Sequence, residues 1–153
     1  MPTILIIDDD KSILSFLKER LMYEGFSVLT AFNGKEGMRM FNDNQVDLVI
    51  TDIIMPEKDG FRTITELKRI CPDIKIIAMS GGLLGYPEYY LDTTKCFGVQ
   101  YTFEKPIKTS DLLEAVYELL NEDKLLNFQN SNKTIHLSPI QTSPVCVSKS
   151  IYT

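Results

Sequence analysis

The stretch TILIIDDDKSILSFLKERLMYEGFSVLTA, residues 3–31, decides the fold of this chain. Its apolar opening, residues 3–7, is rich in β-branched side chains and is stopped by three aspartates, which predicts a buried strand. Residues 11–24 then place apolar side chains at helical spacing, and Gly25 is a suitable helix stop. Residues 27–31 form a second short strand, so the stretch predicts a strand–helix–strand unit.

The same alternation continues along the chain. We expect further helices over residues 35–41, 61–70, 87–97 and 110–121, and further strands over residues 46–51, 74–79 and 101–103. Short strands joined through helices must run parallel, and continuous apolar runs suit strands that are covered on both faces. Crossovers between such strands are right-handed almost without exception. The sequence therefore predicts one doubly wound α/β domain over residues 1–121.

The remaining residues, 122–153, have a different composition. They are rich in Asn, Gln, Ser and Thr, contain two Ser-Pro steps, and sustain no period of 2 or 3.6 residues. Such a segment cannot bury enough apolar surface to offset the cost of ordering it. We expect a polar, weakly ordered C-terminal tail.

Charge and hydropathy exclude several classes of protein. The net charge is −5, from 16 basic and 21 acidic residues, which argues against a general nucleic-acid binder. The longest unbroken apolar runs, residues 4–7 and 76–79, are too short to span a bilayer. The first residues lack the basic and apolar regions of a secretory signal. We expect a cytoplasmic protein with no membrane association.

The cysteines and the histidine give no metal signature. Cys71, Cys96 and Cys146 are far apart in the sequence and in no CxxC spacing, which favours reduced thiols over a zinc site. The single histidine, His136, lies in the polar tail, where we expect it to be solvated.

Polar side chains follow four of the five predicted strands. Asp8 and Asp9 end the first strand, Asp52 the third and Ser80 the fourth, and Lys105 follows the fifth. In an open parallel sheet, ligands bind beyond the carboxyl ends of the strands. The sequence therefore predicts a site at that edge with three carboxylates, a hydroxyl and an ammonium group.

Three carboxylates, a hydroxyl and an ammonium group at one edge could bind a metal ion and accept a phosphoryl group. Three clustered carboxylates repel one another unless a cation lies among them, and an oxygen-only cluster with few protein ligands suits Mg²⁺. One carboxylate can act as a nucleophile toward a phosphoryl group and form an acyl phosphate. The metal ion and the lysine would neutralise charge on the transferring oxygens.

Four motifs carry a resemblance to a known family. They are ILIIDDD at 4–10, DLVITDIIMPEKDG at 47–60, IIAMSGG at 76–82 and FEKP at 103–106. In this order and spacing the chain resembles the receiver domain of bacterial two-component response regulators, over roughly residues 3–121. The resemblance implies a flavodoxin-like fold with strand order 2-1-3-4-5. No output domain follows residue 121, so we expect a stand-alone receiver.

The resemblance also implies roles for individual residues. Those roles are the phosphoacceptor (Asp52), the acidic pair that holds Mg²⁺ (Asp8 and Asp9), a backbone carbonyl ligand to the metal (Ile54), the hydroxyl that follows the phosphoryl group (Ser80) and the charged contact (Lys105). It further implies a cis bond before Pro106. Asp10 would be peripheral, as a helix cap. The family's switch position, often aromatic, is here Thr102, which puts the usual aromatic rotamer switch in doubt.

The function implied is that of a phosphorylatable signalling protein. A histidine kinase or histidine phosphotransfer protein would pass a phosphoryl group to Asp52 in a Mg²⁺-dependent reaction. Output would be an altered protein–protein interaction or a phosphorelay, with an unknown target and without direct DNA binding. Residues 87–121 would form the partner face, and any homodimer would use it. Beyond its own phosphorylation and dephosphorylation, we expect no enzyme activity.

Two alternatives stay open. A haloacid-dehalogenase-like phosphatase also uses an aspartyl phosphate, but it needs a second Asp two residues after the nucleophile, where this chain has Ile54. A phosphorylation-independent binding module could keep the same fold, although the retention of all five polar positions counts against it.

Overall fold

The computed structural model describes residues 1–55, 60–81, 95 and 97–132, and it contains a five-stranded parallel sheet. The elements are β1 (Thr3–Ile7), α1 (Lys11–Tyr23), β2 (Ser27–Ala31), α2 (Gly34–Asp43), β3 (Leu48–Asp52), α3 (Gly60–Ile70), β4 (Lys75–Ser80), β5 (Tyr101–Glu104) and α5 (Thr109–Asn132). The strand order is β2-β1-β3-β4-β5, and every strand pair is parallel. The predicted doubly wound fold is therefore confirmed.

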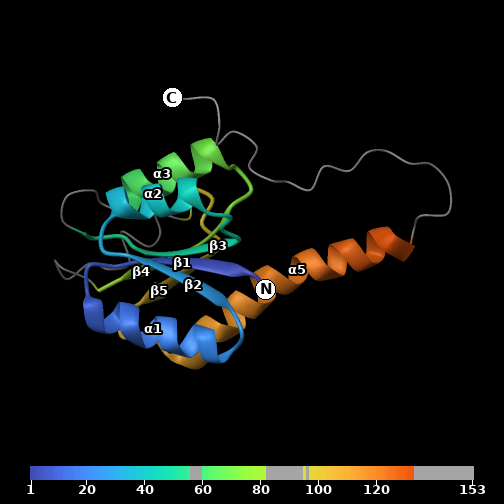
Figure 1. Ribbon diagram of the computed structural model, residues 1–153, viewed down its shortest axis with the longest axis horizontal. Coiled ribbons are helices and arrows are strands. Elements are labelled where there is room, and N and C mark those ends of the chain that lie inside the picture. Colours follow the sequence, from blue (N-terminus) through green and yellow to red (C-terminus); the bar gives the residue numbers. More distant parts are fainter. Residues whose placement is uncertain (56–59, 82–94, 96, 133–153) are drawn as a thin grey trace.

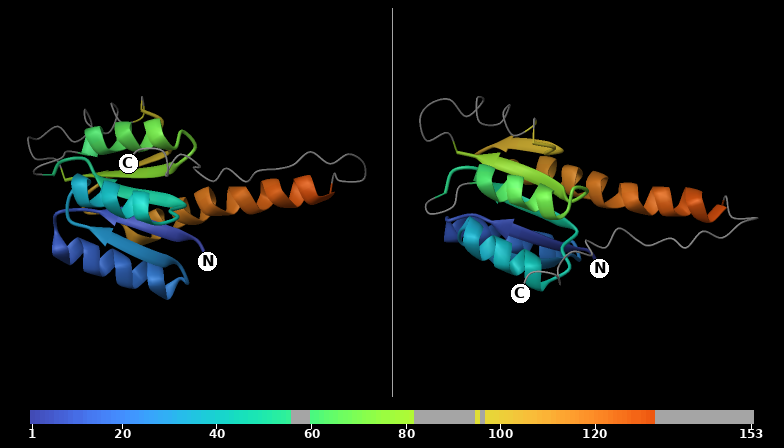
Figure 2. Two further views of the ribbon diagram at one scale, coloured as in Figure 1. Left: turned by 45° about the horizontal axis from the view of Figure 1, so that its top comes forward. Right: turned by 90° about the horizontal axis from the view of Figure 1, so that it is seen from above.

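Helices cover both faces of this sheet (Figures 1 and 2). One layer contains α1 and α5, and the other contains α2 and α3. Strand β1 shows why two layers are needed. Ile4 and Ile6 belong to the core under α1 and α5, whereas Leu5 and Ile7 belong to the core under α2 and α3. Because side chains alternate along a strand, a fully apolar strand must be covered on both sides.

Three strands, β3, β4 and β5, differ slightly from the predicted ranges. Strands β3 and β5 each run one residue further than predicted, to Asp52 and Glu104. Strand β3 begins at Leu48 rather than at residue 46, because the preceding Asp47 lies at the end of the ladder, where its side chain accepts a hydrogen bond from the Thr3 N–H at 2.8 Å. Strand β4 runs one residue further than predicted, to Ser80. Its predicted first residue, Ile74, instead donates its N–H to the Cys71 carbonyl in the preceding turn.

The last helix is longer than the sequence predicts. We expected it to end at residue 121, but α5 continues to Asn132 and projects beyond the edge at which the strands begin (Figure 1). The division into a domain over 1–121 and a tail over 122–153 stays a prediction. The predicted helix over residues 87–97 falls, apart from residues 95 and 97, outside the described residues. His136 also lies outside them.

One expectation about the cysteines is wrong. Cys71 is disulfide-bonded rather than a reduced thiol, and its partner lies outside the described residues. Cys71 is buried at the end of α3, in the core that also contains Val99. Sequence spacing could not reveal this bond, because a disulfide depends on which distant segments the fold brings together.

Within the described part of the chain, none of the helices combines the length and hydropathy needed to cross a bilayer.

Candidate functional site

The carboxyl ends of β1 and β3 place the acidic residues side by side. The register pairs Ile7 with Thr51, so Asp8 and Asp52 lie next to each other at the same edge of the sheet. The backbone of Asp8 is fixed from the other side, because its N–H donates to the Ala31 carbonyl at 3.1 Å. Two strands that are far apart in the sequence therefore deliver neighbouring carboxylates.

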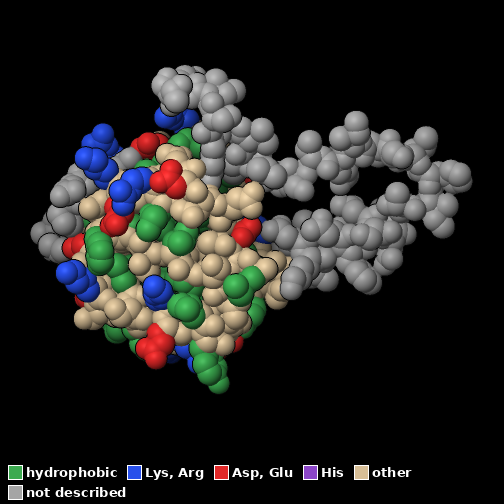
Figure 3. Space-filling model, in the orientation of Figure 1, with side chains coloured by type: hydrophobic (Ala, Val, Ile, Leu, Met, Phe, Trp, Pro, Cys, Tyr) green, Lys and Arg blue, Asp and Glu red, His purple; other side chains and the backbone are tan. Residues whose placement is uncertain are grey.

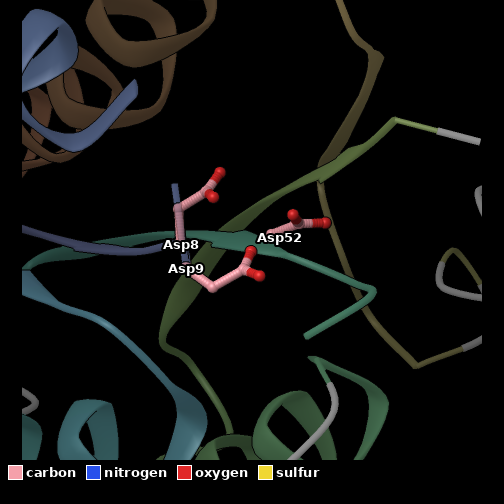
Figure 4. A group of neighbouring side chains, drawn as sticks. All are labelled: Asp8, Asp9 and Asp52. Carbon is pink, nitrogen blue, oxygen red and sulfur yellow. The ribbon is translucent and has the colours of Figure 1, made fainter. Parts of the chain in front are cut away.

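Asp8, Asp9 and Asp52 form one cluster (Figure 4). A carboxylate oxygen from each lies within 4.8 Å of the others. Asp8 is completely buried and Asp52 is 5% exposed, whereas Asp9 is exposed. The cluster thus extends from the interior of the domain to its surface, and an ion could reach it from solvent.

Lys105 joins the two buried carboxylates. Its Nζ lies 2.7 Å from Asp8 Oδ2 and 2.9 Å from Asp52 Oδ2. Its backbone N–H donates to the Ser80 carbonyl at 2.8 Å, which ties the end of β5 to the end of β4. The Lys105-Pro106 bond is cis, as the resemblance implied.

Backbone groups complete the hydrogen bonding of the two buried carboxylates. The Asp10 N–H donates to Asp8 Oδ1 at 2.9 Å, and the Ile54 N–H donates to Asp52 Oδ1 at 3.1 Å. Asp10 itself caps α1, because its side chain accepts from the N–H groups of Ser12 and Ile13. The predicted helix-cap role of Asp10 is therefore confirmed.

Burial governs the ionisation of this site. Burial raises the pKa of Asp8, and the hydrogen bonds from Lys105 and from the Asp10 backbone only partly offset it. Burial alone would lower the pKa of Lys105, but its hydrogen bonds to Asp8 and Asp52 outweigh that effect and the pKa is raised. Lys105 therefore stays charged at neutral pH and offsets negative charge on Asp8 and Asp52.

An open cleft of about 440 Å³ lies over the cluster. The residues that line it are Asp8, Asp9, Asp10, Ile13, Asp52, Ile54, Gly81 and Lys105. Five of the six residues predicted from the sequence therefore share one cavity. Ile13 and Gly81 were not predicted; they come from the helix and the loop that follow the predicted strands.

The sixth predicted residue, Ser80, is not among the described residues that line this cleft. It is the last residue of β4 and is completely buried, next to Gly81 in the lining. Thr102 is half-buried on β5, opposite Ala78 of β4. The neighbouring rings of Tyr101 and Phe103 pack against the core on the α5 side, so Thr102 lies on the other face of the sheet.

Sequence reasoning missed the part played by Gly60. A Cβ at this position would lie 2.3 Å from the Asp52 carbonyl oxygen and 2.5 Å from the Ile53 Cα. The Gly60 N–H also donates to the Ile53 carbonyl at 2.7 Å. The helix was predicted to begin at residue 61, whereas α3 begins at Gly60, whose lack of a side chain allows the helix to start directly against the end of β3.

The family model for the response regulator receiver domain matches residues 4–117. The chain belongs to this family. The family functions as a phosphoacceptor signalling domain of two-component systems, is phosphorylated by histidine kinases and binds Mg²⁺ at an acidic pocket.

Solved structures agree with this assignment. A response regulator receiver domain protein from Clostridium thermocellum is 34% identical, with a TM-score of 0.74 over 82% of this chain and 99% of that one. The response regulator TrrA from Thermotoga maritima, in complex with Mg²⁺ and BeF, is 33% identical, with a TM-score of 0.68 over 78% of this chain and 99% of that one.

Curated relatives include longer proteins. The transcriptional regulatory protein GlrR of Escherichia coli K12 is 35% identical over 120 residues, which are 78% of this chain but 26% of GlrR. The response regulator SaeR of Staphylococcus aureus is 30% identical over 129 residues, 84% of this chain and 55% of SaeR. The chain thus spans about a quarter to a half of the length of these relatives.

Proposed function

We propose that Asp52 is the phosphoacceptor of this receiver and that it takes a phosphoryl group from a histidine kinase or a histidine phosphotransfer protein. The observation that carries the proposal is the bridge of Lys105 between Asp8 and Asp52, at 2.7 and 2.9 Å, under an open cleft. Asp52 is the buried carboxylate in this cleft that comes from the central strand β3.

The transfer is a displacement at phosphorus. An oxygen of the Asp52 carboxylate forms a bond to phosphorus as the phosphorus–nitrogen bond of the donor phosphohistidine breaks, and the electron pair leaves with the imidazole. The Lys105 ammonium lies next to the attacking carboxylate and stabilises negative charge on the transferring oxygens. Ser80, at the adjacent strand end, would donate a hydrogen bond from its hydroxyl group to one of these oxygens in the phosphorylated state.

The residues present fit Mg²⁺. Asp8, Asp9 and Asp52 offer oxygen atoms within 4.8 Å of one another, and we assign the Ile54 backbone carbonyl as a fourth protein ligand. Oxygen ligands, few in number and reachable by water, are what Mg²⁺ prefers. When bound, the ion would neutralise charge at the phosphoryl group.

Output by protein contact or by phosphorelay is the second part of the proposal. The longer relative GlrR, of which this chain covers 26%, is a transcriptional regulatory protein, so the output of this chain is a separate question from that of its relatives. On the side that carries α1, β2 and α2, which is not the proposed partner face, acidic and basic side chains are interspersed with hydrophobic ones (Figure 3), unlike the basic stripe of a nucleic-acid-binding surface.

The test is incubation with Mg²⁺ and acetyl phosphate, followed by intact mass measurement. The wild-type protein should gain one phosphoryl group, and Asp52→Ala should gain none. Asp43→Ala is the matched control, because Asp43 is an exposed aspartate at the end of α2 and should leave labelling unchanged. Undiminished labelling of Asp52→Ala would reject the acceptor. Absence of labelling in the wild type would favour a phosphorylation-independent binding module, and release of phosphate at every turnover would favour a phosphatase.

The metal site has its own test. Mg²⁺ should raise the melting temperature of the wild type, because a ligand that binds only the folded state stabilises it. The Asp8→Ala/Asp9→Ala double variant should lose this response. A full Mg²⁺ response in the double variant would remove these residues from the metal site.

A further inference from the structure

Helix α1 runs beside the edge strand β2 (Figure 1), and a second pocket lies between them. Its volume is about 260 Å³, and the residues that line it are Lys11, Leu14, Ser15, Lys18, Thr30 and Phe32. The four residues from α1 recur at i, i+3, i+4 and i+7, so they share one face of the helix. This pocket has no lining residue in common with the carboxylate cleft.

The apolar part of the pocket offers an accessible aromatic ring. Leu14 is buried, whereas the side chain of Phe32 is 46% exposed. The Nζ of Lys11 lies 5.6 Å from the centroid of the Phe32 ring, at a distance typical of a cation–π contact. The pocket therefore combines an aromatic surface with a positive charge next to it.

The polar side chains of the pocket have no partner in the described part of the chain. The ammonium groups of Lys11 and Lys18 and the hydroxyl groups of Ser15 and Thr30 form no hydrogen bond or ion pair there. Lys105, by contrast, pairs with two carboxylates. Two cations and two hydroxyl groups thus converge on one pocket with their hydrogen-bonding capacity available to a ligand.

The pocket is basic although the protein is acidic. The net charge of the chain is −5, but none of the lining residues is acidic. Two carboxylates belong to residues next to the lining, and each already has partners. Asp10 accepts N–H groups of α1 and lines the carboxylate cleft, and Glu36 accepts from the Phe32 N–H at 2.8 Å and lies 3.9 Å from Arg39. Lys18 lies about 12 Å along α1 from Asp10, so its charge is left for a ligand.

We propose that this pocket binds a small organic dianion that carries one aromatic ring. The ammonium groups of Lys11 and Lys18 pair with the two negative charges. The hydroxyl groups of Ser15 and Thr30 donate hydrogen bonds to the anionic oxygens. The ring of the ligand packs on the exposed ring of Phe32.

The size of the pocket limits the ligand. Pockets for drug-sized ligands measure about 300–1,000 Å³, and this one, at about 260 Å³, lies just below that range. A compound with a single ring is therefore expected rather than a nucleotide. An inorganic anion would pair with the lysines but would leave the ring of Phe32 in contact with water, so it should bind more weakly than a ring-containing dianion.

The test is a titration of the full-length, ¹⁵N-labelled protein in Mg²⁺-free buffer, followed by amide chemical shifts. The probes are phthalate, isophthalate and phenyl phosphate, which place two negative charges differently around one ring. At least one should shift the amides of residues 11–18 and 30–32 saturably. Isophthalamide, a neutral analogue, and inorganic phosphate, which has no ring, should each bind about tenfold more weakly than that probe.

Three results of this titration would overturn the proposal. The first is that none of the three probes causes saturable shifts in these amides at millimolar concentration. The second is that isophthalamide or inorganic phosphate binds as tightly as the best probe. The third is that the shifts are confined to the carboxylate cleft around Asp52 and Lys105.

Variants make the assignment specific. Lys18→Gln keeps most of the side chain but removes its charge, and it should weaken binding of the best probe about tenfold. Thr30→Val removes the hydroxyl group at nearly the same volume and should cause a smaller loss. Lys108→Gln is the matched control, because Lys108 is an exposed lysine outside the pocket and its loss should leave the affinity unchanged.

The amide spectrum of each variant outside the pocket shows whether the variant is folded. Unchanged affinity in folded Lys18→Gln, or an equal loss in Lys18→Gln and Lys108→Gln, would overturn the proposal, because the second result would reflect net charge alone. None of these measurements requires phosphorylation or Mg²⁺, so they stand or fall independently of the proposed function.

Discussion

The carboxylate of Asp8 lies in a buried environment, where its negative charge lowers the stability of the folded protein. It is completely buried, and burial raises its pKa even though Lys105 and the Asp10 N–H both hydrogen-bond to it. A buried ionised group destabilises a protein unless it is fully compensated, and a cation-binding site is a common reason to keep one. In the proposed metal site, Asp8 would therefore lower the stability of the metal-free protein and act as a ligand to the ion.

The first prediction follows from the direction of that shift. A folded-state pKa above the unfolded value of 3.8 means that ionising Asp8 lowers the free energy of unfolding as the pH rises through that range. Without Mg²⁺, Asp8→Asn should therefore raise the melting temperature by a few degrees at pH 7. The difference from the wild type should vanish below about pH 3.8, where Asp8 is protonated in both states.

Thermal melts across pH, with Asp43→Asn as the control at an exposed aspartate, check this prediction. A lower melting temperature for Asp8→Asn at pH 7 would mean that its ion pair with Lys105 outweighs the burial of its charge.

The second prediction concerns Ile54, two residues after the proposed phosphoacceptor. Its side chain lines the cleft and is apolar, and position 82, two residues after Ser80, is glycine. Neither side chain can orient an attacking water molecule. We expect the phosphoryl group on Asp52 to hydrolyse more slowly than in most receiver domains. Substitution Ile54→Asn or Ile54→Glu should shorten the lifetime of the phosphoryl group. Loss of the mass adduct from purified wild-type protein within seconds would contradict this.

At the scale of elements, the junction between β3 and α3 fixes the position of Asp52. Gly60 lies in contact with the Asp52 carbonyl and the Ile53 backbone, and its N–H donates to the Ile53 carbonyl. The helix thus starts against the last residues of the strand. A larger residue at position 60 would push backbone against backbone, where no side-chain rotation can relieve the contact.

The third prediction is that Gly60→Ala destabilises the protein by about 2–3 kcal/mol and slows phosphorylation of Asp52. The matched control is Gly81→Ala, whose Cβ would make only an ordinary contact, 3.6 Å from Cδ of Lys105. Urea unfolding and acetyl-phosphate labelling of both variants provide the measurement. Equal stabilities for the two variants would show that the start of α3 can shift freely.

On the scale of the whole molecule, the site and the end of α5 lie at opposite edges of the sheet. The acidic cluster is at the carboxyl ends of the strands, whereas α5 runs back across the sheet and projects beyond the edge where the strands begin (Figure 1). The start of α5 packs on α1 and the sheet, with Val116 and Leu112 fully covered. A signal from Asp52 must therefore cross the sheet to reach the distal turns of α5.

The fourth prediction uses this separation. Beryllofluoride, a mimic of the phosphoryl group, should reduce hydrogen exchange around Asp52, at the end of β4 and over β5, with smaller changes in residues 109–121. The turns of α5 beyond residue 121 should not respond, because they lie at the far edge. Changes confined to the loops around Asp52 would exclude the proposed 87–121 output face, and a response beyond residue 121 would show that the projecting part of α5 is coupled to the site.

The sequence by itself determined the sheet and the chemistry of its edge. A short apolar run predicts each strand. The residue that follows the run lies at the carboxyl edge of the sheet, and this position does not depend on the packing of neighbouring side chains. Asp8, Asp9, Asp52 and Lys105 could therefore be assigned to one site from local pattern alone, because parallel strands bring all their carboxyl ends to the same edge.

Only the tertiary structure revealed the features that depend on contacts between segments remote in the sequence. The bridge of Lys105 between Asp8 and Asp52, the raised pKa of Asp8, the close approach of Gly60 and the disulfide at Cys71 all follow from distances between residues remote in the sequence. Spacing along the chain carries no measure of burial or of such distances. For that reason, the cysteines were predicted to be reduced thiols, whereas the fold places Cys71 in a disulfide.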